Sequence, residues 1–264
     1  MVTYLLTVVI GVAAGILGSL LGVGGGIIML PATQLIMEMD PVMSIGTTLF
    51  AVIFTSISGA YGHFKNGNVI VNYALYAGLG GITGVLIGSY LFKNLLSNNT
   101  AVLQLLLGLL FAYMGFRMGK ETIRQWHKPA PPLPGQQARN GTNPWKLSAL
   151  GLFTGTLTGI LGIGGGFIMV PAMIWLLGAS PFQAVGTTLL AMFPIAAFGG
   201  LIKVYHGFVN IPVGLILGLG TVIGAQVGVQ LSRYVNQLVF KGVFSALFIY
   251  LAINYLGSVR HIIL

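Results

Sequence analysis

Apolar residues follow one another along this chain in long runs rather than in the short alternating pattern of a water-soluble fold. Lys, Arg, Asp and Glu are absent from Met1–Met37, Pro41–Phe64, Asn66–Phe92, Asn94–Phe116 and Leu147–Ile202. A helix needs about 20 apolar residues to cross the hydrocarbon core of a bilayer. Each run is therefore long enough for at least one membrane-spanning helix.

The runs predict one interrupted apolar segment and three ordinary spans in each half of the chain. The interrupted segments, at about 4–37 and 147–177, contain consecutive glycines and favour a re-entrant hairpin or a pair of crossings. The first is expected to be a retained span, because no basic stretch of a secretory signal precedes it. The ordinary spans are expected at about Pro41–Tyr61, Val69–Phe92, Thr100–Phe116, Pro181–Leu201, Val209–Leu231 and Leu238–Tyr255.

The two halves resemble each other when the chain is shifted by 140 residues. Gly15–Leu91 then aligns with Gly155–Leu231 without a gap, and GVGGGIIMLPA meets GIGGGFIMVPA. The GTTL stretches at Gly46 and Gly186 coincide as well. A gapless register that aligns prolines and threonines as well as glycines indicates an internal repeat.

The fold class expected is an all-α integral membrane bundle of two homologous repeats, each with a Gly-rich broken or re-entrant helix. If the interrupted segment returns to its starting side, each half crosses the membrane an odd number of times and the halves are inverted. If it crosses once, the halves are parallel. The basic residues between spans are equally lopsided in both cases, so the positive-inside rule leaves both open; the length of the first uncharged run favours inversion.

Composition supports a membrane protein. Only 6% of the residues are charged and 56% are hydrophobic, whereas soluble domains carry roughly a quarter charged residues. The formal charge of +9 comes from basic residues between apolar runs, which indicates membrane topology rather than nucleic-acid binding.

Six basic residues and the run KPAPPLPG lie between the halves. They predict an extended cytoplasmic linker at 118–146 between repeats at 1–117 and 147–264, in a multi-pass protein of the cell (inner) membrane.

Catalytic and cofactor-binding patterns are nearly absent from the sequence. The acidic residues are Glu38, Asp40 and Glu121, all at expected span ends, which disfavours a paired-carboxylate site. There is no cysteine, no metal-ligand spacing among the histidines and no phosphate-binding loop. No enzyme activity, metal or cofactor is expected.

The triple-glycine stretches are the strongest candidate site. Each glycine costs a helix about 1 kcal/mol relative to alanine, and irregular backbone at membrane depth is tolerated only against protein or a water-filled cavity. A helix that restarts there presents free N–H groups and a partial positive charge to a ligand. The expected substrate-binding residues are Gly22, Gly24, Gly25, Gly26, Pro31, Gly162, Gly164, Gly165, Gly166 and Pro171.

Polar and basic residues in both halves could add to this site. Thr47, Thr48, Thr187 and Thr188 could contact the substrate or bond carbonyls of their own helices. His63, Lys65, Lys203 and His206 lie at span ends and could attract an anion or extend toward the interface. The spaced glycines at Gly80, Gly84 and Gly88, and at Gly220, Gly224 and Gly228, are expected to pack helices closely, and could serve a homodimer.

The duplicated GxGGG-to-Pro and GTT motifs resemble those of the TauE/SafE family of sulfite and organosulfonate exporters. The resemblance covers nearly the whole chain apart from the linker. It implies a permease for small sulfur-containing anions, with re-entrant Gly-rich elements flanking the pathway at the glycines, prolines and threonines named above. Family members often carry an Asp in a GxVDW-like stretch; here the halves read Gly67-Asn68-Val69-Ile70-Val71 and Gly207-Phe208-Val209-Asn210-Ile211. This chain has Ile70 and Asn210 where that Asp would be, so the resemblance does not imply ion coupling through this carboxylate.

The function expected is therefore alternating-access transport of a small anion, with that anion and the lipid bilayer as partners. The alternatives are an anion channel, a non-transporting membrane subunit or a membrane-embedded enzyme. The shortage of intramembrane Asp, Glu, His and Cys disfavours an enzyme.

Overall fold

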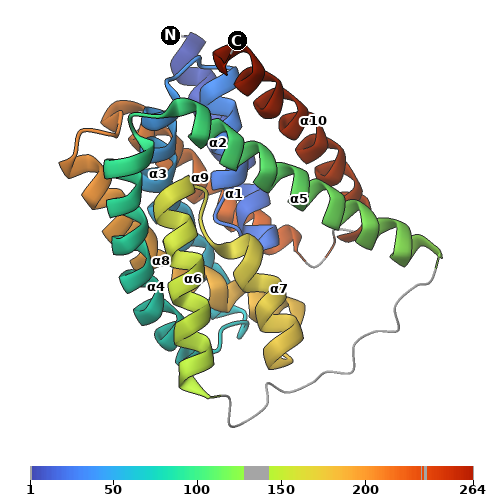
Figure 1. The fold of residues 1–264 in the computed structure, drawn as a ribbon. Coiled ribbons are helices and arrows are strands. Elements are labelled where there is room, and N and C mark those ends of the chain that lie inside the picture. Colours follow the sequence, from blue (N-terminus) through green and yellow to red (C-terminus); the bar gives the residue numbers. More distant parts are fainter. Residues whose placement is uncertain (1, 128–142, 233, 235–236, 264) are drawn as a thin grey trace. The chain divides into compact units, whose positions relative to one another are not determined.

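The structure is a computed structural model that describes residues 2–127, 143–232, 234 and 237–263, and no strand occurs among them (Figure 1). The helices are α1 Val2–Leu21, α2 Gly26–Leu35, α3 Pro41–Lys65, α4 Val71–Leu91, the π-helix η1 Phe92–Leu96, α5 Thr100–His127, α6 Pro144–Leu161, α7 Gly166–Leu177, α8 Pro181–Tyr205, α9 Ile211–Leu231 and α10 Gln237–Ile263. In the described chain, six helices are long and apolar enough to cross a membrane. The prediction of an all-helical multi-pass membrane protein is confirmed at this level.

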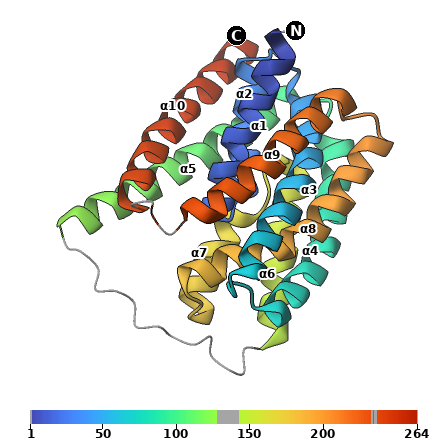
Figure 2. The same ribbon diagram turned by 180° about the vertical axis from the view of Figure 1, so that it is seen from behind.

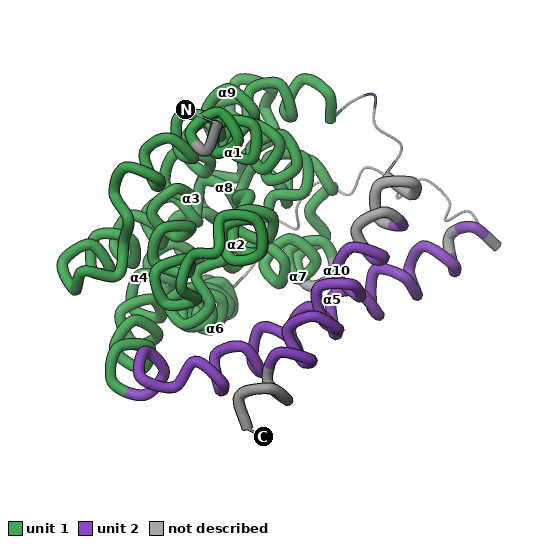
Figure 3. The backbone as a smooth tube through the Cα atoms, turned by 90° about the horizontal axis from the view of Figure 1, so that it is seen from above, with its two compact units in different colours: residues 1–94, 135–232 green, residues 95–134, 233–264 purple. Residues whose placement is uncertain are grey.

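Packing divides the helices into two compact units, coloured separately in Figure 3. The larger unit comprises residues 1–94 and 135–232, and the smaller one residues 95–134 and 233–264. In the smaller unit α5 packs against α10, and the Phe111 ring stacks on the rings of Phe248 and Tyr255. The boundaries expected from the repeat follow the sequence rather than the packing, and they stay a prediction. Residues 128–142, which include the proline run, lie outside the described residues.

Helix α5 continues to His127, whereas the sequence suggested that the span ends near Phe116. Arg117 and Glu121 form an ion pair at 3.5 Å within this extension, at the i,i+4 spacing that stabilises helices. The change from apolar to charged residues therefore falls within one helix rather than at its end.

Capping residues explain why α3 and α8 begin where they do, 140 residues apart. The Oδ2 atom of Asp40 accepts hydrogen bonds from the N–H groups of Val42 and Met43, at 2.9 and 3.3 Å. Ser180 and Gln183 form a reciprocal capping box at the start of α8. A proline follows each cap, at the position where its fixed φ suits a helix.

The spaced glycines join α4 to α6, and α1 to α9 (Figure 2). A Cβ atom at Gly80, Gly84 or Gly88 would collide with the carbonyl oxygens of Ser148, Leu152 and Thr156 of α6. The same holds for Gly224 and Gly228 of α9 against Val12 and Ile16 of α1. The predicted close packing is confirmed, and both glycine faces are used inside the chain rather than left open for a second copy.

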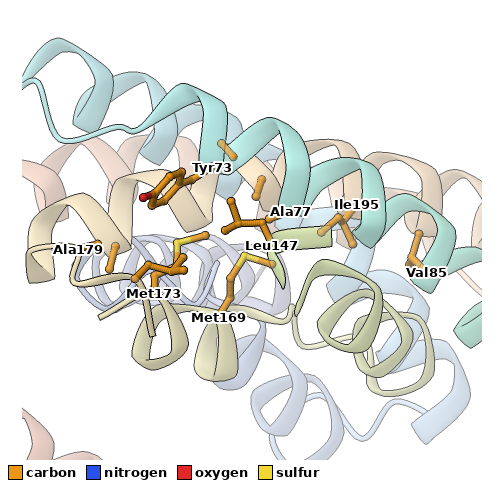
Figure 4. Packing of buried hydrophobic residues seen from close by; sticks show 12 residues of the cluster. Tyr73, Ala77, Val85, Leu147, Met169, Met173, Ala179 and Ile195 are labelled. Carbon is orange, nitrogen blue, oxygen red and sulfur yellow. The ribbon is translucent and has the colours of Figure 1, made fainter. Parts of the chain in front are cut away.

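Helices α3 and α8 cross the middle of the larger unit in opposite directions. Gly59, near the end of α3, lies against Leu189 near the start of α8, whereas Gly200, near the end of α8, lies against Phe50 near the start of α3. Next to them, α4, α6, α7 and α8 enclose a buried apolar cluster in which Ala77, Leu147, Met169 and Ile195 meet (Figure 4). This frame holds the two glycine segments.

Candidate functional site

Both triple-glycine stretches interrupt a helix, as the sequence predicted. Helix α1 ends at Leu21 and α2 begins at Gly26, while α6 ends at Leu161 and α7 begins at Gly166. At the centre of each break the backbone takes a positive φ, 79° at Gly24 and 81° at Gly164, which side-chain-bearing residues rarely adopt. All residues of both breaks are buried.

The two glycine segments, Gly22–Gly26 and Gly162–Gly166, lie in direct contact with each other. A Cβ atom at Gly26 would lie 2.6 Å from the carbonyl oxygen of Ile163, and one at Gly166 would collide with the carbonyl oxygen of Gly22. Because only hydrogen fills these positions, backbone meets backbone. We call this contact the glycine crossing.

One flexible side chain covers the glycine crossing. The methyl group of Met192, on α8, contacts both segments: a Cβ atom at Gly24 would lie 2.6 Å from it, and one at Gly164 would collide with it. Val52, which the 140-residue shift pairs with Met192, lies against Gly24. Met192 is only 1% exposed, so the centre of the crossing is sealed by an unbranched thioether side chain.

Helices α2 and α7 begin at the glycine crossing, and the first N–H groups of each have no acceptor within their own helix. Hydrogen bonding in α2 begins when Ile28 and Met29 donate to the carbonyl of Gly25, and in α7 when Ile168 and Met169 donate to that of Gly165. The N–H groups that precede these bonds are the donors that a helix N-terminus offers to an anion.

Each short helix packs beside the helix that precedes it. A Cβ atom at Gly25, just before α2, would lie 2.7 Å from the carbonyl oxygen of Ala14. Beyond the other end of α2, the sulfur of Met37 lies 3.9 Å from the Thr7 hydroxyl, near the start of α1. The contacts of α2 thus move back along α1 as the chain advances. At the start of α7, Gly165 lies against Thr154 of α6.

Pro31 and Pro171 lie inside α2 and α7 rather than at the glycine crossing. Neither can donate a backbone hydrogen bond, so the carbonyl four residues earlier in each helix loses its usual partner. Both helices nevertheless continue past the proline, α2 to Leu35 and α7 to Leu177.

Thr47 and Thr187 bind backbone of the opposite half of the chain. The N–H of Asn210 donates to Oγ1 of Thr47, and the N–H of Ile70 donates to Oγ1 of Thr187, both at 2.9 Å. Asn210 also caps α9 through its side-chain oxygen, which accepts from the N–H of Val213 at 3.3 Å. Asn210 is therefore the N-cap residue of α9.

Thr48 and Thr188 do not bind the opposite half of the chain as Thr47 and Thr187 do. The Thr48 hydroxyl donates to the carbonyl of Ser44 in its own helix, and the Thr188 hydroxyl contacts the sulfur of Met173 at 3.5 Å. All four threonines are buried. The segments that carry them adjoin the glycine crossing, because Gly162 lies against Ile45 and Gly22 against Val185.

His63 and Lys65 have different surroundings at the end of α3. His63 is 1% exposed, and its Nε2–H donates to the carbonyl of Ser19 at 3.1 Å. Lys65 is exposed, and its Nζ lies 4.6 Å from the centre of the Tyr61 ring. Lys65 is therefore outside the buried core.

Lys203, which the 140-residue shift pairs with His63, is buried rather than extended to an interface. It is 1% exposed, and its Nζ lies 3.2 Å from the centre of the Phe92 ring. The partly exposed His206 packs edge-on against Tyr205 and lies 6.1 Å from the Phe208 ring. Phe208 in turn packs edge-on against Phe92 at 5.5 Å.

Sequence reasoning missed Met192, Phe92 and the acceptor role of Thr47 and Thr187. The 140-residue shift pairs Met192 with Val52, but nothing in the sequence distinguishes either residue from its apolar neighbours. No sequence signal connects Phe92 with Lys203, since their contact depends on how α4 lies against α8.

Comparisons with known proteins agree with the membrane character of the chain. A family model described as sulfite exporter TauE/SafE matches residues 7–255. The chain is 31% identical to the probable membrane transporter protein YunE of Bacillus subtilis (strain 168), over 79% of this chain and 81% of that one. It is 29% identical to the probable membrane transporter protein YdhB of the same organism, over 79% and 82%.

A third relative is the probable membrane transporter protein MJ0441 of Methanocaldococcus jannaschii, 26% identical over 81% of this chain and 80% of that one. No solved structure shows significant similarity to the chain. A match over most of the sequence, together with the helical membrane architecture, establishes that the chain belongs to the sulfite exporter TauE/SafE family of membrane transporters.

Proposed function

We propose that this protein carries a small anion, a sulfur oxyanion or an organosulfonate, across the cell membrane by alternating access around the glycine crossing. The observation that carries the proposal is the contact between two unwound backbone segments from different halves of the chain. Unwound backbone inside a membrane protein is tolerated where it lines a pathway or is buried by protein. Paired broken helices form the substrate sites of many secondary transporters.

The helix ends at the crossing favour an anion over a cation. A helix N-terminus carries about half a positive charge. At an effective dielectric constant near 20, such an end about 4 Å from an anion contributes about 2 kcal/mol. Two ends would offset part of the cost of removing the anion from water.

Side-chain charge supports the same sign of ligand. In the described part of the larger unit, the acidic residues are Glu38 and Asp40, of which Asp40 caps α3. Neither lies in a helix that meets at the crossing. Lys203 is a buried cationic side chain on α8, the helix whose Met192 covers the crossing. An anion would therefore meet donors and positive charge without a fixed negative charge to repel it. The family description supplies the expectation of sulfur chemistry.

The proposed mechanism needs two inverted repeats, with α1–α2 and α6–α7 as re-entrant hairpins. Three observations support it: helices α3 and α8 run in opposite directions, α2 returns along α1, and the pairs α2/α7, α3/α8 and α4/α9 begin 140 residues apart. Inversion allows one half to rock against the other around a fixed site. The basic linker at 118–146 would then be cytoplasmic.

The absence of cysteine makes the inversion directly testable. We would introduce single cysteines in place of the exposed residues Lys65 and Tyr205, at the ends of α3 and α8, and treat intact cells with a membrane-impermeant maleimide. Inverted halves expose one of these cysteines to the outside and the other to the cytoplasm. Labelling of both from the same side would contradict the proposed topology.

Transport itself is tested in liposomes that contain the purified protein. We expect uptake of radiolabelled sulfite, methanesulfonate or sulfate that saturates with concentration and is lost in Gly25→Leu and Gly165→Leu. A leucine at either position would enter the space of α1 or α6, so insertion into the membrane and yield are measured in parallel. Wild-type flux in both variants would remove the glycine crossing from the mechanism.

The same liposomes separate the alternatives. Non-saturating flux with single-channel currents would indicate an anion channel. No protein-dependent flux of any of the three anions would favour a non-transporting membrane subunit.

A further inference from the structure

The buried ammonium group of Lys203 lacks a hydrogen-bond partner. The described residues provide no acceptor for its Nζ, and no carboxylate lies within 4 Å of it. Its Nζ lies over the face of the Phe92 ring, which attracts a cation but accepts no ordinary hydrogen bond. A buried ammonium with three unused donors is costly unless a ligand completes it.

The hydroxyl group of Ser89 is a second buried donor without a partner, and it lies at the same level as Lys203 along the neighbouring helix. Ser89 on α4 is 3% exposed, and its Oγ also has no hydrogen-bond partner among the described residues. Helices α4 and α8 pack side by side in the same direction, since Gly81 contacts Ile195 and Gly199 contacts Val85. One further turn along both helices brings Ser89 level with Lys203.

Phe92 lies three residues after Ser89, so both side chains lie on neighbouring positions of one helix face. Its ring covers the ammonium group of Lys203 and packs against Phe208. The other side of Ser89 is formed by α6, where a Cβ atom at Gly159 would lie 2.7 Å from the Ser89 nitrogen. Gly159 is close to the end of α6, three residues before the break at Gly162.

We propose that Lys203 and Ser89 form a binding site for a small anion between α4 and α8, next to the glycine crossing but separate from it. The inference deepens the proposed function, because the ligand expected is the transported oxyanion. The ammonium group supplies the positive charge and up to three donors, and the hydroxyl group supplies one more. A ligand with only acceptor oxygens, such as sulfite, sulfate or the sulfonate group, satisfies all of them.

The equivalent position with the two halves exchanged, between α3 and α9, differs in both residues. His63 replaces Lys203 there, and its Nε2–H is already bonded to the Ser19 carbonyl. The residue equivalent to Ser89 is Val229, which has no hydroxyl group. The pairing of a lysine on α8 with a serine on α4 therefore has no counterpart between α3 and α9, which carry His63 and Val229.

The test measures anion binding rather than transport. Purified protein in detergent is titrated with radiolabelled sulfite, sulfate and methanesulfonate, with chloride as a competitor. Wild-type protein is compared with Lys203→Gln, Lys203→Arg and Ser89→Ala. The matched control is Lys146→Gln, which removes the same charge from an exposed position at the start of α6.

We expect Lys203→Gln to weaken oxyanion binding by about 10- to 100-fold, as the loss of a charge-assisted hydrogen bond would. Ser89→Ala is expected to weaken it by about 3- to 10-fold, with Lys203→Arg in between and Lys146→Gln like wild type. If chloride displaces the oxyanion completely at equal concentration, the site is a halide site and the assigned ligand class is wrong.

Unchanged affinity in both Lys203→Gln and Ser89→Ala would overturn the proposal, whether or not liposomes show transport. If Lys203→Gln does not fold, Ser89→Ala decides alone, because it removes a single oxygen atom. Wild-type binding that depends on Lys203 without any flux would refute the proposed transport but keep this site. Flux with wild-type properties in every variant would keep the proposed function and refute the site.

Discussion

The backbone N–H of Asn210 donates a hydrogen bond to the Thr47 hydroxyl oxygen at 2.9 Å, across 163 residues of sequence. The bond between Ile70 and Thr187 repeats this arrangement with the halves exchanged. Each half thus satisfies the backbone group just before a long helix of the other. The threonine motif, which the sequence suggested as a substrate contact, has a structural role at its first position.

Thr47→Val and Thr187→Val are expected to lower stability by about 1–3 kcal/mol each. Valine keeps the shape but leaves a partly buried N–H without an acceptor. Thermal unfolding in detergent measures the effect. Thr47→Ser restores the oxygen and should recover most of the loss. Thr48→Val is the matched control, because the Thr48 hydroxyl donates to a carbonyl of its own helix. Equal losses for Thr47→Val and Thr48→Val would argue against the role of the cross-half bonds.

Gly84→Ala and Gly224→Ala are expected to destabilise the protein strongly, by separating α4 from α6 and α9 from α1. The added methyl group would enter the space of the Leu152 or Val12 carbonyl oxygen, which belongs to backbone and cannot move aside alone. Gly257→Ala in α10 is the control, because nothing lies within 4 Å of its added Cβ atom. The fraction of protein that remains monodisperse after heating gives the comparison, and tolerance of the first two changes would show that the interfaces can widen.

Glu38→Gly is expected to raise stability by about 1 kcal/mol. Glu38 follows α2 with a φ of 51°, whereas the equivalent residue after α7 is Gly178 with a φ of 66°. The left-handed conformation suits glycine and strains other residues. Gly178→Ala should shift the unfolding midpoint in the opposite direction. A lower midpoint for Glu38→Gly would mean that the glutamate side chain stabilises this turn.

Gly164→Ala is expected to reduce both stability and transport. The new methyl group would meet the Met192 methyl group in a backbone conformation, φ 81°, that alanine adopts only with strain of about 1–2 kcal/mol. Flux per correctly folded molecule in liposomes separates the two effects. Gly207→Ala carries a comparable strain, at φ 74°, with open space around its Cβ atom. A similar loss of flux in both variants would attribute the effect to strain rather than to the crossing.

The sequence was sufficient to predict the helices and their interruption. Apolar runs located the spans, and consecutive glycines located the breaks at Gly22–Gly26 and Gly162–Gly166, because local chemistry controls both. The glycine faces of α4 and α9 also followed from i,i+4 spacing.

The sequence could not predict contacts that depend on how helices lie against one another. Lys203 reads as an interfacial lysine until α4 and α8 are aligned and Phe92 covers it. Thr47 and Thr48 are adjacent and chemically identical, yet one faces the opposite half and the other its own helix. The continuation of α5 past Phe116 was missed because charged residues were taken as the end of the span.

The exchange of backbone partners between the halves has a consequence for biosynthesis. A ribosome completes Thr47 long before it reaches Asn210, and α1 long before α9. Helices of the first half are therefore synthesised before the helices of the second half that they contact in the folded protein. The contacts between the halves can therefore form only once α9 has been synthesised, which makes completion of the larger unit a late step in assembly.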